Sequence, residues 1–131
     1  MSAVTTHVLD TARGVPAAGV MVRLEQVSDS GRTEIARART AADGRASGLG
    51  PDRLPHGTYR LVFDTGEYLG RLDRGSGSGE RGSAGGGSGG RAVFFPEVAV
   101  TFTVDPADGE APHYHVPLLL SPFGYATYRG S

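Results

Sequence analysis

The fold is decided by residues 94–131, which read FFPEVAVTFTVDPADGEAPHYHVPLLLSPFGYATYRGS. Between residues 98 and 104, valine or phenylalanine alternates with alanine or threonine, which is typical of a strand with one buried face. The same period places His113, His115, Pro117 and Leu119 on one face and Tyr114, Val116, Leu118 and Leu120 on the other. Ser121 and Pro122 end this run, and residues 123–129 can return beside it. The segment therefore predicts an antiparallel hairpin at the end of the sequence.

The same segment concentrates the candidate chemical groups. His115 points away from the apolar row and has a second histidine, His113, on its own face. Pro117 cannot donate a ladder hydrogen bond, which favours an edge strand, a bulge or an outward-facing amide at this position. A bulge would re-aim His115 into a pocket.

Upstream, the same alternation predicts four further strands, at residues 4–10, 20–25, 33–40 and 59–63. The turn at 14–19 separates the first two, which predicts that they form a pair. Residues 65–72 are predicted to form a short helix with Thr65 as its N-cap and Glu67 in its first turn. Residues 75–90 are Gly or Ser at 13 of 16 positions, which predicts a flexible insertion.

Seven or eight short strands and one brief helix favour an all-β fold, an antiparallel β-sandwich, over a parallel α/β fold. The 131 residues are expected to form one domain, 1–131. A net charge of −1 offers no basic surface for nucleic acid. The absence of cysteine excludes disulfides, thiolate nucleophiles and thiolate zinc sites. No basic start with an apolar leader and no membrane-length run is present, which predicts a cytoplasmic protein without a membrane partner.

Four residues are candidates for chemistry, and each has an ordinary structural explanation. A single histidine in an apolar strand, such as His7, is more often structural than catalytic. Arg45 follows an Asp-Gly turn, where arginines are usually solvated, and Tyr128 could simply pack. For His115 the structural and catalytic explanations are balanced, because its face is not the apolar one. Taken singly, none of them assigns a function.

Three motifs together resemble the 5-hydroxyisourate hydrolases, the enzymatic branch of the transthyretin-like family. They are His7-Val8-Leu9-Asp10-Thr11, Thr40-Ala41-Ala42-Asp43-Gly44-Arg45, and the terminal His113-Tyr114-His115-Val116-Pro117-Leu118-Leu119-Leu120-Ser121-Pro122 with Tyr125-Ala126-Thr127-Tyr128-Arg129-Gly130-Ser131. The motifs occur in the family's order and spacing. Only the glycine-rich segment and its borders lie outside the resemblance, and the segment looks like an insertion.

The resemblance implies a fold, an activity and a site. The fold would be a prealbumin-like sandwich of two four-stranded sheets, assembled as a homotetramer with active sites at the dimer-dimer interface. The activity would be hydrolysis of 5-hydroxyisourate to 2-oxo-4-hydroxy-4-carboxy-5-ureidoimidazoline in urate degradation, without cofactor or metal. The implied catalytic residues are His7, Arg45 and His115, and the implied substrate-binding residues are Tyr128, Arg129, Gly130 and Ser131.

The chemistry of these side chains suits that reaction. A neutral imidazole is an effective general base near neutral pH, since its pKa is about 6.5. Arg45 would bind the carbonyl or ureide oxygens and stabilise the oxyanion. His7 and His115 would together orient and deprotonate water, and the sequence leaves open which of them is the base. Tyr128 would line the pocket or donate a hydrogen bond.

Three alternatives remain at this point. His7, His113 and His115 could form a histidine-only metal site, although no acidic ligand stands in an obvious place. The chain could be a small-ligand carrier like the transthyretin hormone carriers, which share the fold but lack this residue set and the Tyr-Arg-Gly-Ser ending. It could also be a structural sandwich module, although such modules lack the C-terminal motif.

Overall fold

The computed structural model describes residues 2–76 and 92–130. Its strands are β1 (Val4–Asp10), β2 (Val15–Pro16), β3 (Met21–Ser28), β4 (Gly31–Arg39), β5 (Arg45–Ala46), β6 (Gly57–Phe63), β7 (Val98–Val104), β8 (Tyr114–His115), β9 (Leu118–Ser121) and β10 (Gly124–Thr127). A helix, α1 (Thr65–Ser76), follows β6, and a 3-10 turn, η1 (Pro106–Asp108), follows β7. The chain in these ranges is thus built mainly from short strands, as the alternation predicts.

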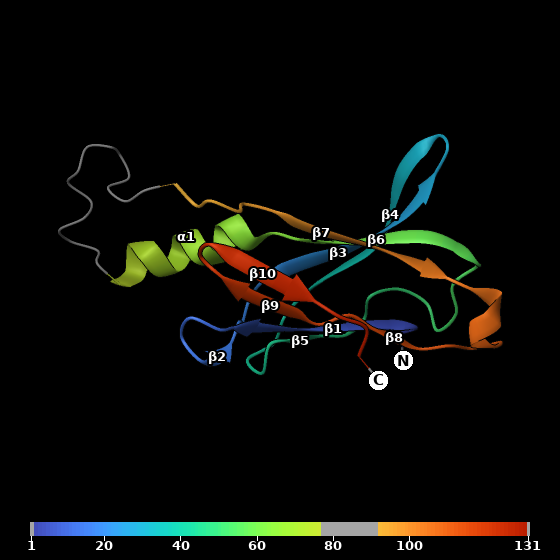
Figure 1. The fold of residues 1–131 in the computed structure, drawn as a ribbon, viewed down its shortest axis with the longest axis horizontal. Coiled ribbons are helices and arrows are strands. Elements are labelled where there is room, and N and C mark those ends of the chain that lie inside the picture. Colours follow the sequence, from blue (N-terminus) through green and yellow to red (C-terminus); the bar gives the residue numbers. More distant parts are fainter. Residues whose placement is uncertain (1, 77–91, 131) are drawn as a thin grey trace.

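Two sheets form the sandwich (Figure 1). The first sheet has the order β10-β9-β1-β2, with β5 and β8 also paired to β1, and the second has the order β4-β3-β6-β7. Pairing is antiparallel throughout the described strands except where β8 and β9 run parallel to β1. The all-β sandwich is therefore confirmed. The first sheet has six strands rather than four, and three of them, β2, β5 and β8, are only two residues long.

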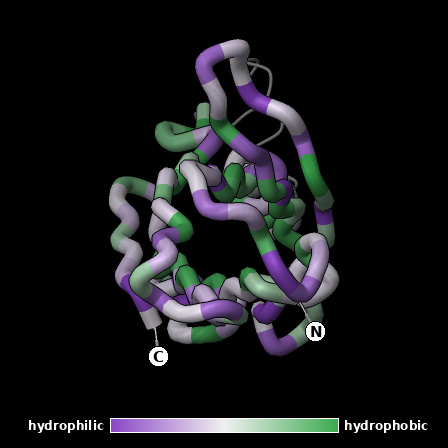
Figure 2. The backbone as a smooth tube through the Cα atoms, turned by 90° about the vertical axis from the view of Figure 1, so that its right-hand side faces the viewer, coloured by the Kyte–Doolittle hydropathy of each residue, from purple (hydrophilic) through white to green (hydrophobic). Residues whose placement is uncertain are grey.

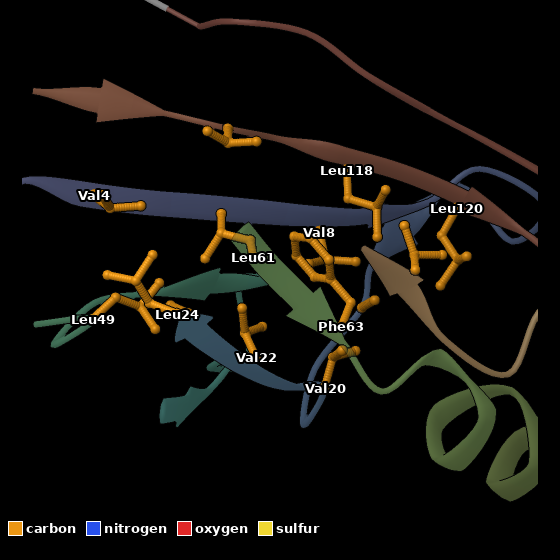
Figure 3. Packing of buried hydrophobic residues seen from close by; sticks show 14 of the residues in the cluster. Val4, Val8, Val20, Val22, Leu24, Leu49, Leu61, Phe63, Leu118 and Leu120 are labelled. Carbon is orange, nitrogen blue, oxygen red and sulfur yellow. The ribbon is translucent and has the colours of Figure 1, made fainter. Parts of the chain in front are cut away.

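The core lies between the sheets. Viewed from the end, the backbone forms two layers around an interior that side chains fill (Figure 2). Leu118 and Leu120 of β9 point toward Leu61 and Phe63 of β6 (Figure 3), and all four are fully buried. Full burial of a side chain of this size contributes about 1.5–3 kcal/mol. Because apolar side chains fill the space between the two sheets, functional groups must lie on one of the two outer faces or at the rims of the sandwich.

The C-terminal segment folds largely as its alternation predicts. Tyr114, Leu118 and Leu120 are buried, whereas His113 is exposed and His115 is half-buried. Pro117 falls in the break between β8 and β9, where it needs no ladder partner. The predicted hairpin is present as β9 and β10, in the register Gly124 opposite Ser121.

Two local predictions are wrong, and a third falls on residues that are not described. β1 and β3 do not pair, because the turn at 14–19 carries the chain from the first sheet to the second. The helix begins at Thr65, but Asp64 is its cap, since the Asp64 carboxylate accepts from the Glu67 amide (3.1 Å). The Thr65 hydroxyl instead donates to the Phe95 carbonyl. Residues 77–90 of the predicted Gly/Ser insertion lie outside the described residues, and residues 75 and 76 belong to α1.

Candidate active site

The outer faces of the two sheets differ in chemistry. On the second sheet, Glu25 accepts from Arg23 at 2.8 Å and lies 3.3 Å from Arg60. The Arg23 hydrogen bond holds the pKa of the Glu25 carboxyl below its usual range. Charges on this face are thus neutralised by one another. The outer face of the first sheet instead carries the histidines, which makes it the functional candidate.

Strand register brings the candidate residues together on that outer face. Along β1, Val4, Thr6, Val8 and Asp10 are buried, so the intervening Thr5 and His7 point outward. Arg45 of β5 lies opposite His7, and His115 of β8 lies opposite Thr5. Residues from three distant parts of the sequence therefore meet on the outer face of the first sheet, on and beside β1.

The Asp43-Gly44 turn fixes His7 and Arg45. Gly44 has φ +82°, and a Cβ there would lie 2.4 Å from the Val8 carbonyl oxygen, so only glycine fits. The His7 Nε2–H donates to the Asp43 carbonyl at 2.9 Å; a carbonyl can only accept, so this nitrogen carries the proton. The Asp43 carboxylate accepts from the Arg45 amide at 3.0 Å. The Arg45 side chain is exposed, with Nε 3.9 Å from the same carboxylate.

His115 is held between β1 and the C-terminal tail. Its Nδ1 lies 2.9 Å from the Thr5 hydroxyl, which also lies 3.1 Å from Nε2 of His113. Burial lowers the pKa of His115 below its usual range, and the charges of Arg45, His113 and His7 lower it further. The imidazole is consequently neutral at pH 7 and available as a base.

The tail crosses His115. The Gly130 amide donates to the His115 carbonyl at 2.8 Å, and a Cβ on Gly130 would stand 2.6 Å from Cδ2 of the His115 ring. The preceding residue fastens the tail: the Arg129 guanidinium lies 4.9 Å from the Tyr114 ring centroid and 3.5 Å from the Asp108 carboxylate. Glycine at 130 lets the backbone lie directly against the imidazole.

Asp108 and Tyr114 complete this fastening. The Tyr114 hydroxyl donates to the Asp108 carboxylate at 2.6 Å. That hydrogen bond is the main reason why the pKa of the Asp108 carboxyl is below its usual range, and the Arg129 charge adds to the effect. The cluster of Asp108, Tyr114 and Arg129, hereafter the tail clamp, thus joins η1, β8 and the tail.

The structure therefore gathers most of the predicted site. His7, Arg45, His115 and Gly130 surround one part of the outer face. Tyr128 is 56% exposed, Arg129 is engaged in the tail clamp, and Ser131 lies outside the described residues. Within the described ranges, no group of three histidine, cysteine or acidic side chains is placed to hold a metal ion.

Residues 4–130 match the model of the HIUase/Transthyretin family. The chain belongs to that family. A 5-hydroxyisourate hydrolase of Mesorhizobium japonicum is 44% identical over 129 residues, covering 97% of this chain and 90% of its own. The structure of the Klebsiella pneumoniae 5-hydroxyisourate hydrolase matches with a TM-score of 0.74 at 32% identity, covering all of both chains.

A transthyretin matches the fold as closely as the hydrolase does. Sea bream transthyretin, solved in complex with thyroxine, matches with a TM-score of 0.76 at 29% identity and covers 97% of this chain and 93% of its own. Fold similarity alone therefore does not separate hydrolase from carrier in this family, and the side chains must do so.

A further finding is that no helix among the described residues is long and apolar enough to cross a membrane.

Sequence reasoning missed three residues that hold the site. Thr5 looks like an ordinary strand threonine. The only signal in the sequence is its position two residues before His7, which places both side chains on the same face. Asp108 lies between the strand pattern at 98–104 and His113, in a stretch with Pro and Gly where aspartate is common. Tyr114 was assigned to the apolar face; its ring is indeed buried, but its hydroxyl reaches Asp108.

Proposed function

We propose that the chain hydrolyses 5-hydroxyisourate, the reaction for which its relatives in Mesorhizobium japonicum and Klebsiella pneumoniae are named. The observation that carries the proposal is the strand register that places the half-buried His115, Arg45 and His7 together on one outer face. Burial lowers the pKa of His115, and the charges of Arg45 and His7 lower it further. A neutral base beside a permanent cation is the arrangement that water attack on a ring amide requires. The product would be 2-oxo-4-hydroxy-4-carboxy-5-ureidoimidazoline.

In the proposed mechanism, His115 is the general base. Its imidazole takes a proton from water as the water oxygen attacks the substrate carbonyl, and the imidazolium returns that proton to the ring nitrogen as the C–N bond breaks. Such general acid-base catalysis contributes typically about 10²–10⁴-fold. Arg45 remains charged and donates to the carbonyl oxygen as negative charge develops there. The Nε2–H of His7 is committed to the Asp43 carbonyl, so His7 orients water or substrate through its remaining nitrogen.

The tail supplies the binding surface in this proposal. Gly130 lies against the His115 ring, and Tyr128, two residues earlier, is exposed and available to contact substrate. Arg129 acts by keeping the tail in place through the tail clamp. Ser131 follows Gly130 directly and is proposed to contact substrate as well. These roles need no metal, so we expect activity to survive exhaustive chelation.

We further propose a homotetramer with sites at the dimer-dimer interface. The terminal strands β7 and β10 leave one edge of each sheet open, and large aromatic side chains near them are exposed, with Phe94 at 65% and Phe123 at 60%. Exposed apolar clusters beside open edges favour association between chains. The candidate site also faces outward from the first sheet, so a second chain could close it. Light scattering at assay concentration tests the assembly.

A carrier function is the second candidate, because the thyroxine-bound sea bream transthyretin has the same fold. The deciding experiment adds purified protein to urate undergoing oxidation by urate oxidase and follows the absorbance of 5-hydroxyisourate. We expect wild-type protein to accelerate its decay, with or without a chelator, and His115→Gln to do so far less. Binding of the compound without accelerated decay would favour the carrier. Loss on chelation and recovery with zinc would contradict the metal-free mechanism.

A further inference from the structure

A single hydroxyl connects two histidines at the site. Thr5 Oγ1 lies 2.9 Å from Nδ1 of His115 and 3.1 Å from Nε2 of His113. Both distances are within hydrogen-bond range. His113 is exposed while His115 is half-buried, so Thr5 joins an inner imidazole to one in contact with solvent.

A threonine hydroxyl donates one proton and can accept two hydrogen bonds, which allows the pair three arrangements. In the first, His115 donates from Nδ1 to Thr5, and Thr5 donates to Nε2 of His113. In the second, His113 donates from Nε2 to Thr5, and Thr5 donates to Nδ1 of His115. In the third, both rings donate to Thr5, whose proton then points away from both. Only the first satisfies the Thr5 proton within the pair and also leaves Nε2 of His115 free to accept a proton.

We propose that Thr5 is a positioning residue that selects the base-competent tautomer of His115 by donating its proton to His113. The inference rests on the proposed function, in which His115 is the base. When His115 takes a proton from water at Nε2, its Nδ1–H already points to Thr5, and the chain of hydrogen bonds runs on to the exposed His113. The imidazolium charge is thereby stabilised without any rearrangement.

The surrounding groups agree with this direction. Charges facing His115 come from Arg45 on β5, His7 on β1 and His113 next to β8, and all three disfavour its protonation, with burial as the largest effect. The opposing contribution is a hydrogen bond with the Thr5 backbone, which favours the protonated ring. The Asp43 carboxylate lies 3.9 Å from Arg45 Nε and is engaged by the Arg45 amide. The Thr5 hydroxyl contact with Nδ1 of His115 is separate from that backbone hydrogen bond.

The test compares Thr5→Val, which removes the hydroxyl but keeps the branched shape, with Thr5→Ser, which keeps the hydroxyl. Long-range proton-nitrogen NMR at alkaline pH assigns each histidine tautomer, and initial rates give kcat and KM. We expect wild type and Thr5→Ser to hold His115 with its proton on Nδ1, and Thr5→Val to lose that preference. We expect kcat of Thr5→Val to fall roughly 3- to 10-fold, the value of one hydrogen bond, with KM unchanged.

A second variant keeps the proposal open to refutation if Thr5→Val is poorly folded. His113→Phe removes the ring nitrogen that accepts the Thr5 proton, so His115 should lose its preference for a proton on Nδ1, as in Thr5→Val. An Nε2–H tautomer of His115 in the wild type, or identical rates and tautomers in Thr5→Val and Thr5→Ser, would overturn the proposal. A Thr5-dependent tautomer in a protein that hydrolyses no 5-hydroxyisourate would support the hydrogen-bond assignment and overturn the proposed function.

Discussion

Replacing Gly130 with alanine tests whether the tail positions the proposed base. The added Cβ would stand 2.6 Å from Cδ2 of the His115 ring, whereas carbon atoms in contact are separated by about 3.5–4.0 Å. Ring and tail must therefore separate by about 1 Å. A displacement of about 1 Å at a reacting group costs roughly 10²-fold in rate. We expect kcat for 5-hydroxyisourate to fall by that factor.

Stability should hardly change, because Gly130 adds one hydrogen bond at the chain's end and lies outside the core. We expect the free energy of unfolding in urea to stay within about 1 kcal/mol of wild type. Gly124→Ala is the matched control, since its Cβ would meet only Ser121 Oγ at 3.7 Å, an ordinary contact. It should leave kcat intact. If Gly130→Ala retains full kcat, the tail does not rest on His115 in solution and the positioning argument is wrong.

Four further outcomes follow from the site. His115→Gln should lower kcat by roughly 10²-fold or more, measured from initial rates, with little change in unfolding temperature. Arg45→Gln removes a cation that lowers the pKa of His115, so an NMR titration should show that pKa rise and the acid limb of activity should move to higher pH. Asp108→Asn should free Arg129, seen as faster amide exchange at Gly130 and a lower rate. Because the folded pKa of His115 is lowered, its contribution to stability is complete above about pH 6.5 and is lost as pH falls below it; urea titrations across that range should lose this component in His115→Gln.

Much of the fold follows from alternation alone. Residues 98–104 and 59–63 have the period of a half-buried strand and nothing that competes with it, and they form β7 and β6. The false pairing of β1 with β3 has a different origin, because a turn of a given length can close a hairpin or cross between sheets. Which one it does depends on burial of both strands in the sandwich, which is a property of the whole chain.

The motifs single out candidate residues, but the sequence does not give their geometry. His7, Arg45 and His115 came from motifs, whereas their meeting depends on the register of β5 and β8 against β1. The role of Thr5 depends on that same register, and a threonine in a strand has an adequate explanation in β-propensity. The tail clamp was hidden because its members are spread over a turn, a buried strand and the tail.

Because β8 pairs with β1, the site can assemble only late in the synthesis of the chain. Thr5 and His113 are separated by 108 positions, and Thr5 and His115 by 110, so the site unites the first and last portions of the sequence. Contacts of such long range form slowly, because a large loop must close first. During synthesis, β1 leaves the ribosome many seconds before β8 exists, and the edge of β1 that pairs with β8 and β9 must wait unpaired. A nascent chain stalled before residue 113 could hold much of the second sheet in place and still have no catalytic power.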